Sequence, residues 1–200
     1  MTKRWVREHK REHYYKKAKK AGYRSRSAYK LIQINDRYNL ISKGDVVIDL
    51  GAAPGGWSQV AQEIVGPEGK VLAVDIQRME PLSGVILIRG DMTKQETVDK
   101  ILAEVSDVDV ILSDMSPSIS GHYSMDQARS IDLAEKALLV AEQTLKHKGN
   151  FVVKVFQGEL FSDFFQKIKA RFTFVKGHSP KASRKSSSEI YVVGKGFRAR

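Results

Sequence analysis

The segment 46–57, VVIDLGAAPGGW, constrains the fold more than any other part of the chain. An uninterrupted β-branched run is typical of a parallel strand buried on both faces. The run ends at Asp49, and the turn that follows contains Gly51, Gly55 and Gly56. Ligands of open α/β sheets bind at the carboxyl ends of the strands, where glycines let the backbone approach closely. The segment therefore predicts a strand, a ligand-binding turn and a helix, in that order.

The spacing of these glycines argues against a phosphate-binding turn. It reads G-x-x-x-G-G, unlike the G-x-G-x-x-G of dinucleotide-binding turns and the G-x-x-x-x-G-K-[ST] of P-loops. Pro54 also lacks the N–H group that a phosphate cradle would use. S-adenosylmethionine carries a sulfonium and an amino-acid tail, which carboxylates suit better than a helix N-terminus does. The turn therefore favours this cofactor.

Acidic residues stand at the ends of four predicted strands: Asp49, Asp75, Asp91 and Asp114. Because the carboxyl ends of parallel strands meet at one edge of a sheet, we expect these acids to surround one pocket. In that pocket Asp75 would accept hydrogen bonds from both ribose hydroxyls. Asp91 and Met92, after the third strand, would contact the adenine edge.

Apolar runs and turn residues alternate along the rest of the chain. We expect strands at 46–50, 70–75, 84–88, 108–113, 150–156, 172–176 and 189–193, and helices at 25–39, 56–65, 94–105, 125–146 and 160–170. This alternation predicts an α/β fold with a mostly parallel sheet and helices on both faces. A chain of 200 residues, 42% of them hydrophobic, has room for one such domain. We expect a basic aromatic arm at 1–24 and a single domain at 25–200.

The formal net charge of +11 is concentrated at the two ends of the chain. Residues 1–30 carry a net charge of +10 and residues 176–200 one of +6, whereas residues 31–175 carry −5. Aromatic residues are interleaved with the basic residues of the first segment: Trp5, Tyr14, Tyr15, Tyr23 and Tyr29. Basic groups that contact phosphates and aromatic rings that stack on bases together indicate RNA binding. A solvated arm that binds nothing specific is the alternative.

Cysteine is absent from the sequence, which excludes disulfides, thiolate metal sites and thiol nucleophiles. This composition fits a reducing cytosol, so we expect a cytoplasmic protein. No apolar run approaches the length that spans a membrane, and we expect no membrane partner.

Transfer of a methyl group to a hydroxyl needs a group that accepts the hydroxyl proton. Lys154 is a candidate because it interrupts the otherwise apolar segment FVVKVF, and burial disfavours the charged form of a lysine. Lys30 would be a second cation near it, while Asp114 and Glu189 would orient the lysines and balance their charge. The alternative is that Lys154 only extends into water at the end of a strand.

Five segments resemble the FtsJ (RlmE) family of ribose 2′-O-methyltransferases: SRSAYKL (25–31), DLGAAPGGWSQ (49–59), DMSP (114–117), VKVF (153–156) and SSEIY (187–191). The resemblance covers about residues 22 to 194. It implies a Rossmann-like methyltransferase fold with seven strands, the last antiparallel, and no metal. The implied catalytic tetrad consists of Lys30, Asp114, Lys154 and Glu189, with Lys154 as the proton acceptor. The implied contacts to S-adenosylmethionine are Gly55, Trp57, Asp75, Asp91 and Asp114.

The resemblance also implies an RNA substrate. One type of family member methylates a uridine ribose of large-subunit ribosomal RNA, and a sister branch methylates the tRNA anticodon loop. The short chain resembles the ribosomal type more closely, so we expect ribosomal RNA or the large subunit as partner and a monomeric enzyme. A ribosome assembly factor with an inactive site stays open, although the complete tetrad argues against it. A small-molecule methyltransferase would have no use for the basic first segment.

Overall fold

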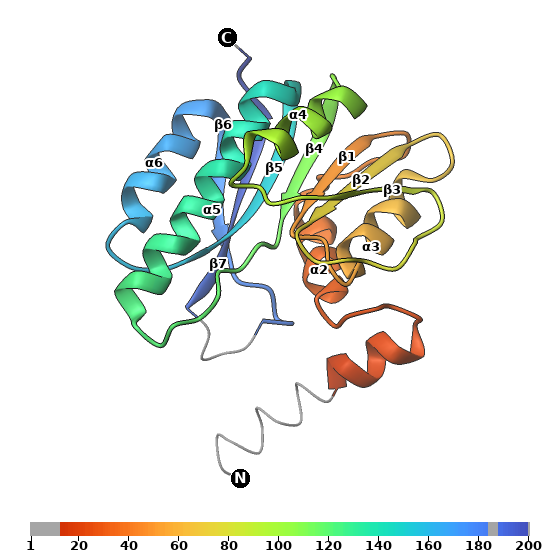
Figure 1. Cartoon of the computed structure of the whole chain (residues 1–200), viewed down its shortest axis with the longest axis horizontal. Helices are drawn as coiled ribbons and strands as arrows, with labels where there is room; N and C mark the ends of the chain where they lie inside the picture. Colours follow the sequence, from red (N-terminus) through yellow and green to blue (C-terminus); the bar gives the residue numbers. More distant parts are fainter. Residues whose placement is uncertain (1–12, 184–187, 200) are drawn as a thin grey trace.

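The computed structural model describes residues 13–183 and 188–199 of the chain. Its described strands form one seven-stranded sheet in the order β3-β2-β1-β4-β5-β7-β6 (Figure 1). The strands are β1 (Val46–Leu50), β2 (Lys70–Asp75), β3 (Val85–Arg89), β4 (Val108–Ser113), β5 (Leu145–Phe156), β6 (Phe172–His178) and β7 (Glu189–Phe197). Strands β1 to β5 pair in parallel, whereas β7 is antiparallel to both β5 and β6. The predicted fold class is confirmed, including the antiparallel last strand.

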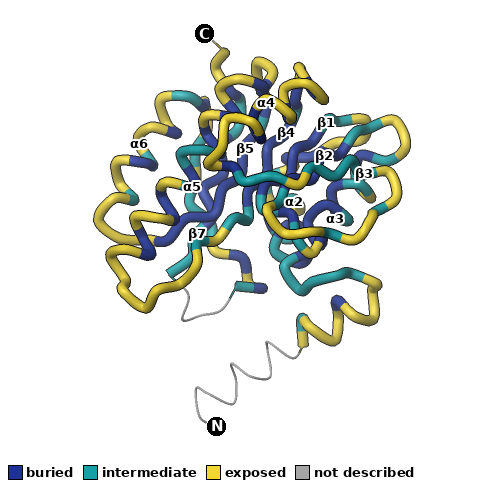
Figure 2. Tube along the Cα trace, viewed as in Figure 1, coloured by how far each residue is buried: buried dark blue, intermediate teal, exposed yellow. Residues whose placement is uncertain are grey.

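Helices cover both faces of this sheet. They are α2 (Ala28–Tyr38), α3 (Gly56–Val65), α4 (Gln95–Glu104), α5 (Tyr123–Thr144) and α6 (Phe161–Arg171). One buried apolar cluster joins the sheet to α4, α5 and α6, and a second joins the opposite face to α2 and α3. The strands run through the buried centre of the molecule, as Figure 2 shows. Because successive side chains of a strand point to opposite faces, the central strands contribute to both clusters.

The boundary between α5 and β5 differs from the expectation. The helix was expected to reach residue 146 and the strand to begin at 150, but α5 ends at Thr144 and β5 begins at Leu145. Leu145 pairs with Val108 and Asn150 with Val110. The chain therefore advances by five residues in β5 where β4 advances by two, which is a shift in the pairing register. The intervening residues bulge out of the sheet, and Lys148 has a positive φ of 67°. No described helix is both long and apolar enough to cross a membrane.

Part of the predicted arm is described and packs on the domain. Residues 13–20 are helical, and Ala18 forms a small buried cluster with Tyr29 and Ala182. The side chain of Gln33, on α2, donates to the Tyr14 hydroxyl at 3.1 Å and accepts from the Ala182 N–H at 3.1 Å. Helix α2 therefore holds both the arm and the loop between β6 and β7.

Candidate active site

A pocket of about 370 Å³ lies at the carboxyl ends of β1, β2, β3 and β4. Its lining comprises Gly51, Ala53, Val74, Asp75, Ile76, Gln77, Gly90, Asp91, Met92, Asp114, Met115, Ser116, Pro117 and Leu133. Three of the predicted acids are in this lining, which includes no lysine or arginine. The pocket is large enough for a small-molecule cofactor. Its charge suits a cationic ligand and disfavours a phosphate.

Because Gly51 has no side chain, the turn after β1 can contact the segment after β4, and both segments line the pocket. The φ of Gly51 is +77°, and a Cβ built there would lie 2.7–2.9 Å from the side chain and backbone of Met115. No larger residue can occupy the position without displacing the segment that follows β4. A glycine is therefore required at position 51 for a steric reason.

The backbone orients two of the pocket carboxylates. Asp75 accepts hydrogen bonds from the N–H of Ala53 at 2.9 Å and from that of Gln77 at 2.7 Å. Asp91 accepts from the N–H and the hydroxyl of Thr93, at 2.9 and 2.8 Å. These bonds hold the pKa of Asp91 below its ordinary value. Asp91 is therefore negatively charged at neutral pH.

Three of the residues predicted to contact the cofactor do not line the pocket: Asp49, Gly55 and Trp57. Trp57 is buried and donates its indole N–H to the Ser27 carbonyl at 2.9 Å. Asp49 is completely buried and accepts a hydrogen bond from the Ser58 hydroxyl at 2.6 Å. Burial raises the pKa of Asp49 to about 7, although the Ser58 bond opposes the shift. The contact of these three residues with a cofactor stays a prediction.

Lys154 lies beside the pocket rather than in water. Its side chain is 6% exposed, and Nζ forms an ion pair with Oδ1 of Asp114 at 3.1 Å and donates a hydrogen bond to the main-chain oxygen of Asp114 at 2.7 Å. The alternative of a lysine that only extends into solvent is therefore wrong. Since Asp114 also lines the pocket, it connects the cavity to the buried lysine.

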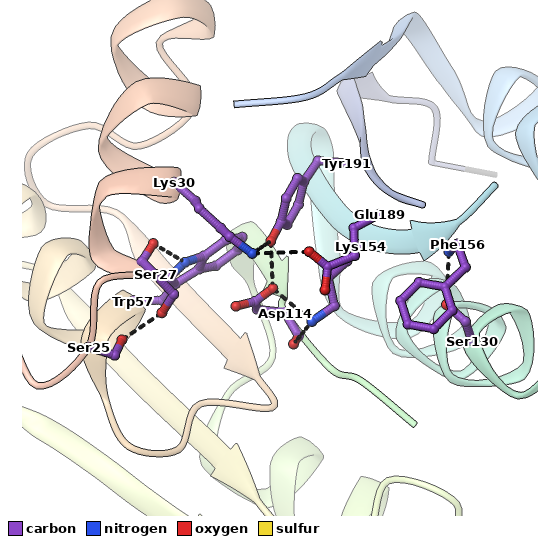
Figure 3. Close-up of polar contacts among 10 residues, drawn as sticks. All are labelled: Ser25, Ser27, Lys30, Trp57, Asp114, Ser130, Lys154, Phe156, Glu189 and Tyr191. Carbon is purple, nitrogen blue, oxygen red and sulfur yellow. Dashed lines mark hydrogen bonds and ion pairs between the residues drawn. The ribbon is translucent and has the colours of Figure 1, made fainter. Parts of the chain in front are cut away.

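The other two members of the predicted tetrad meet Asp114 through a tyrosine (Figure 3). Lys30, on α2, lies 3.4 Å from a carboxylate oxygen of Glu189 and donates to the Tyr191 hydroxyl at 3.0 Å. That hydroxyl donates in turn to Oδ1 of Asp114 at 2.7 Å. The structure thus brings Lys30, Asp114, Lys154 and Glu189 into one hydrogen-bonded network.

Tyr191 is a member of this network for which the sequence predicted no role. It lies on β7 directly opposite Lys154 on β5, so both side chains point to the face that α2 covers. Complete burial and the nearby Asp114 carboxylate raise its pKa well above the ordinary value, which keeps the hydroxyl protonated. The sequence offers one signal for Tyr191: it stands two residues after Glu189, and residues two apart in a strand point to the same face of the sheet.

The aromatic residues of the basic segment 1–30 are less available than expected. Tyr29 is only 7% exposed, and its ring packs against those of Tyr14 and Tyr23 at 5.7 and 5.8 Å. The prediction that Tyr29 offers a stacking surface is therefore wrong, because the ring packs where the arm docks on α2. Tyr15, at 60% exposed, remains available. Trp5 lies outside the described residues.

Within residues 13–183 and 188–199, no three His, Asp or Glu side chains are grouped closely enough to hold a metal ion.

The sequence model of FtsJ-like methyltransferases matches residues 23–197. The chain is 55% identical over 189 residues to Ribosomal RNA large subunit methyltransferase E of Archaeoglobus fulgidus, across 94% of this chain and 97% of the relative. It is 49% identical to the protein of the same name from Methanothermobacter thermautotrophicus, across 100% of this chain and 96% of the relative.

Solved structures agree with this relationship. A protein from Plasmodium falciparum, assigned as a ribosomal RNA methyltransferase, superimposes with a TM-score of 0.81 at 29% identity, covering 89% of this chain and 100% of that one. A chain of the fibrillarin/Nop5p complex, at 22% identity and a TM-score of 0.60, covers 85% and 83% and supports the fold alone. The family match spans most of the chain, and the chain therefore belongs to the FtsJ-like methyltransferase family.

Proposed function

We propose that this protein transfers a methyl group from S-adenosylmethionine to a ribose 2′-hydroxyl, on a uridine of large-subunit ribosomal RNA. The observation that carries the proposal is the double role of Asp114. Asp114 lines the pocket and its carboxylate also pairs with Lys154, so a proton acceptor adjoins the cavity that would hold the methyl donor.

The pocket residues fit S-adenosylmethionine. The lining includes the carboxylates of Asp75, Asp91 and Asp114 and no lysine or arginine, a charge that attracts the sulfonium and ammonium groups. Asp75 would hold the ribose hydroxyls, and Asp91 with Met92 would contact the adenine. When bound, the cofactor supplies an electrophilic methyl group, and its sulfur is released as a thioether.

The geometry of Lys154 supports its role as proton acceptor. A tetrahedral Nζ has three positions besides its bond to Cε; one of them donates to the main-chain oxygen of Asp114, and Oδ1 of the same residue lies 3.1 Å away as the ion-pair partner. In the neutral amine one of the other positions is a lone pair, which accepts the proton that the 2′-hydroxyl loses as it attacks. The resulting ammonium is balanced by the Asp114 carboxylate. The Tyr191 hydroxyl, which accepts from Lys30, donates to the same oxygen of that carboxylate and helps to hold it in place.

The substrate assignment rests on the relatives and on charge. Two relatives that match almost the whole chain are named Ribosomal RNA large subunit methyltransferase E. The basic end segments suit an RNA backbone, since phosphate contacts position an RNA without reading its sequence. We further propose that the enzyme is monomeric and acts in the cytoplasm.

A methyl-transfer assay with three substrates tests this proposal. Purified protein is incubated with labelled S-adenosylmethionine and large ribosomal subunits, naked ribosomal RNA or bulk tRNA, and the modified nucleoside is identified by mass. We expect a 2′-O-methylated uridine in ribosomal RNA. Label in tRNA alone would overturn the substrate assignment. No label in any RNA, from a protein that binds the cofactor, would contradict the activity.

A further inference from the structure

An aromatic and basic surface lies where the last turn of α2 meets the edge strand β6. Its members, which we call the α2–β6 surface, are Arg37, Tyr38, Phe174, Lys176 and His178. The Tyr38 ring is central, with its centroid 6.2 Å from that of Phe174 and 5.4 Å from that of His178. The Arg37 guanidinium lies over the same ring at 5.7 Å. None of these residues belongs to the predicted catalytic or cofactor site, although Lys176 and His178 lie in the basic segment 176–200.

The surface is open to solvent. Phe174 is 45% exposed, Arg37 and Lys176 are exposed, and Tyr38 and His178 are half-buried. Partial burial and the Arg37 charge lower the pKa of His178. The imidazole is therefore neutral at physiological pH and available as a flat ring. Exposed rings next to basic groups are what single-stranded nucleic acids bind, since bases stack on the rings and phosphates pair with the cations.

The surface begins next to the catalytic network. His178 on β6 is directly opposite Tyr191 on β7, which is directly opposite Lys154 on β5 (Figure 3 shows Tyr191 and Lys154). Side chains opposite one another in antiparallel strands share a face. Two strand spacings put the backbone of His178 roughly 10 Å from that of Lys154. From there the surface continues about 13 Å along β6 to Phe174.

The charge of the two elements favours a polyanion. Helix α2 and strand β6 together carry Lys30, Arg37 and Lys176 against the single acid Asp36. A strand from another protein is a poorer fit, because an exposed lysine on an edge strand disfavours the addition of a further strand.

We propose that the α2–β6 surface binds nucleotides that flank the methylated ribose of the RNA substrate, with bases stacked on Phe174 and His178 and a phosphate on Lys176. This assignment rests on the proposed action on RNA. It gives the substrate strand a direction across the enzyme, from Lys154 past Tyr191 and His178 toward Phe174.

RNA binding by the full chain tests the proposal. The probe is a short, fluorescently labelled, single-stranded RNA of mixed sequence, followed by anisotropy at several salt concentrations. Phe174→Ala should weaken binding roughly 5- to 150-fold, the range expected for loss of one stacked base. Phe174→Tyr should retain the wild-type affinity because it keeps the ring. A plot of log affinity against log salt falls with increasing salt, and Lys176→Ala should make this fall less steep by about 0.7.

Two matched variants control for exposure and charge. Leu139→Ala removes an apolar side chain that is 42% exposed on α5, on the opposite face of the sheet. Lys43→Ala removes a lysine that is 71% exposed and precedes β1, at the end of the strand away from the pocket. Leu139→Ala should leave the RNA affinity unchanged. Lys43→Ala should change it only by the general effect of removing one surface charge. Thermal unfolding verifies that every variant is folded, and the exposed Lys176→Ala keeps the test valid should Phe174→Ala be unstable.

Kinetics with ribosomal RNA separate this proposal from the function on which it rests. In Phe174→Ala the KM for RNA should rise while kcat at saturating RNA stays that of the wild type. Wild-type affinity and salt slope in both Phe174→Ala and Lys176→Ala would overturn the surface assignment, even if the wild type methylates RNA. Conversely, weakened binding in these variants with no methyl transfer by the wild type would leave the surface supported and refute the proposed function.

Discussion

Replacing Asp49 with asparagine should make the stability of the protein less dependent on pH. Asp49 is the penultimate residue of β1 and is completely buried. Ser58 donates to its Oδ2, whereas Oδ1 has no hydrogen-bond partner among the residues that the structure describes. Burial raises the pKa of this carboxyl to about 7, and the negative charges of Asp114 and Asp75 add to the shift. Asparagine has the same shape and cannot ionise.

The size of the effect follows from linkage between folding and proton binding. The pKa of the folded state, about 7, is higher than the value of about 3.9 for an unfolded aspartate. The folded protein therefore binds the proton more tightly, and the stability that this provides is lost as the pH rises through about 7. Between about pH 5 and pH 8 the wild type should lose about 2.5 kcal/mol of unfolding free energy through Asp49 alone.

Urea denaturation of wild type and Asp49→Asn, without cofactor, measures this effect. Other titrating groups are common to both proteins, so their contributions cancel in the difference. The stability of the variant relative to the wild type should increase by about 2.5 kcal/mol from pH 5 to pH 8. A difference that stays constant over this range would show that the carboxylate is charged throughout, and would refute the reasoning from burial.

Two further variants test the pocket and the network. Gly51→Ala should cost about 1–3 kcal/mol of unfolding free energy, because the new Cβ would lie 2.7–2.9 Å from Met115. The variant should also lose cofactor binding in calorimetry. Cofactor affinity equal to that of the wild type would contradict the steric argument. Tyr191→Phe removes a buried hydroxyl that donates to Asp114 and accepts from Lys30, and should cost about 1.5–3 kcal/mol in urea denaturation with a lower kcat. Unchanged stability and kcat in this variant would show that the hydroxyl does not support the network.

The first and last residues of the central strands could be predicted because these segments have distinctive local sequences. The segments 46–50, 70–75 and 108–113 are apolar runs that end near an acid, and they coincide with β1, β2 and β4. The boundary after α5 could not be predicted in this way. There the chain passes from helix to strand at Leu145 without an intervening turn, and pairing with β4 rather than local propensity decides where the strand begins.

The candidate site could be predicted in part. Lys154 and Asp114 belong to distinctive segments, so each could be identified from its neighbours in the sequence. The position of Tyr191 depends on the register between β5 and β7, which local sequence does not determine. The burial of Tyr29 depends likewise on the docking of residues 13–20 against α2, a long-range contact that the basic composition of the arm concealed.

The single-turnover rate of methyl transfer in Lys154→Ala tests the central claim most directly. The measurement uses ribosomal RNA, saturating S-adenosylmethionine and excess enzyme, after calorimetry has verified that the variant binds the cofactor. If Lys154 accepts the proton of the 2′-hydroxyl, the rate should fall about 10²- to 10⁴-fold while cofactor affinity stays close to that of the wild type. A rate within a few fold of the wild type would show that the proton leaves by another route, and would contradict the account.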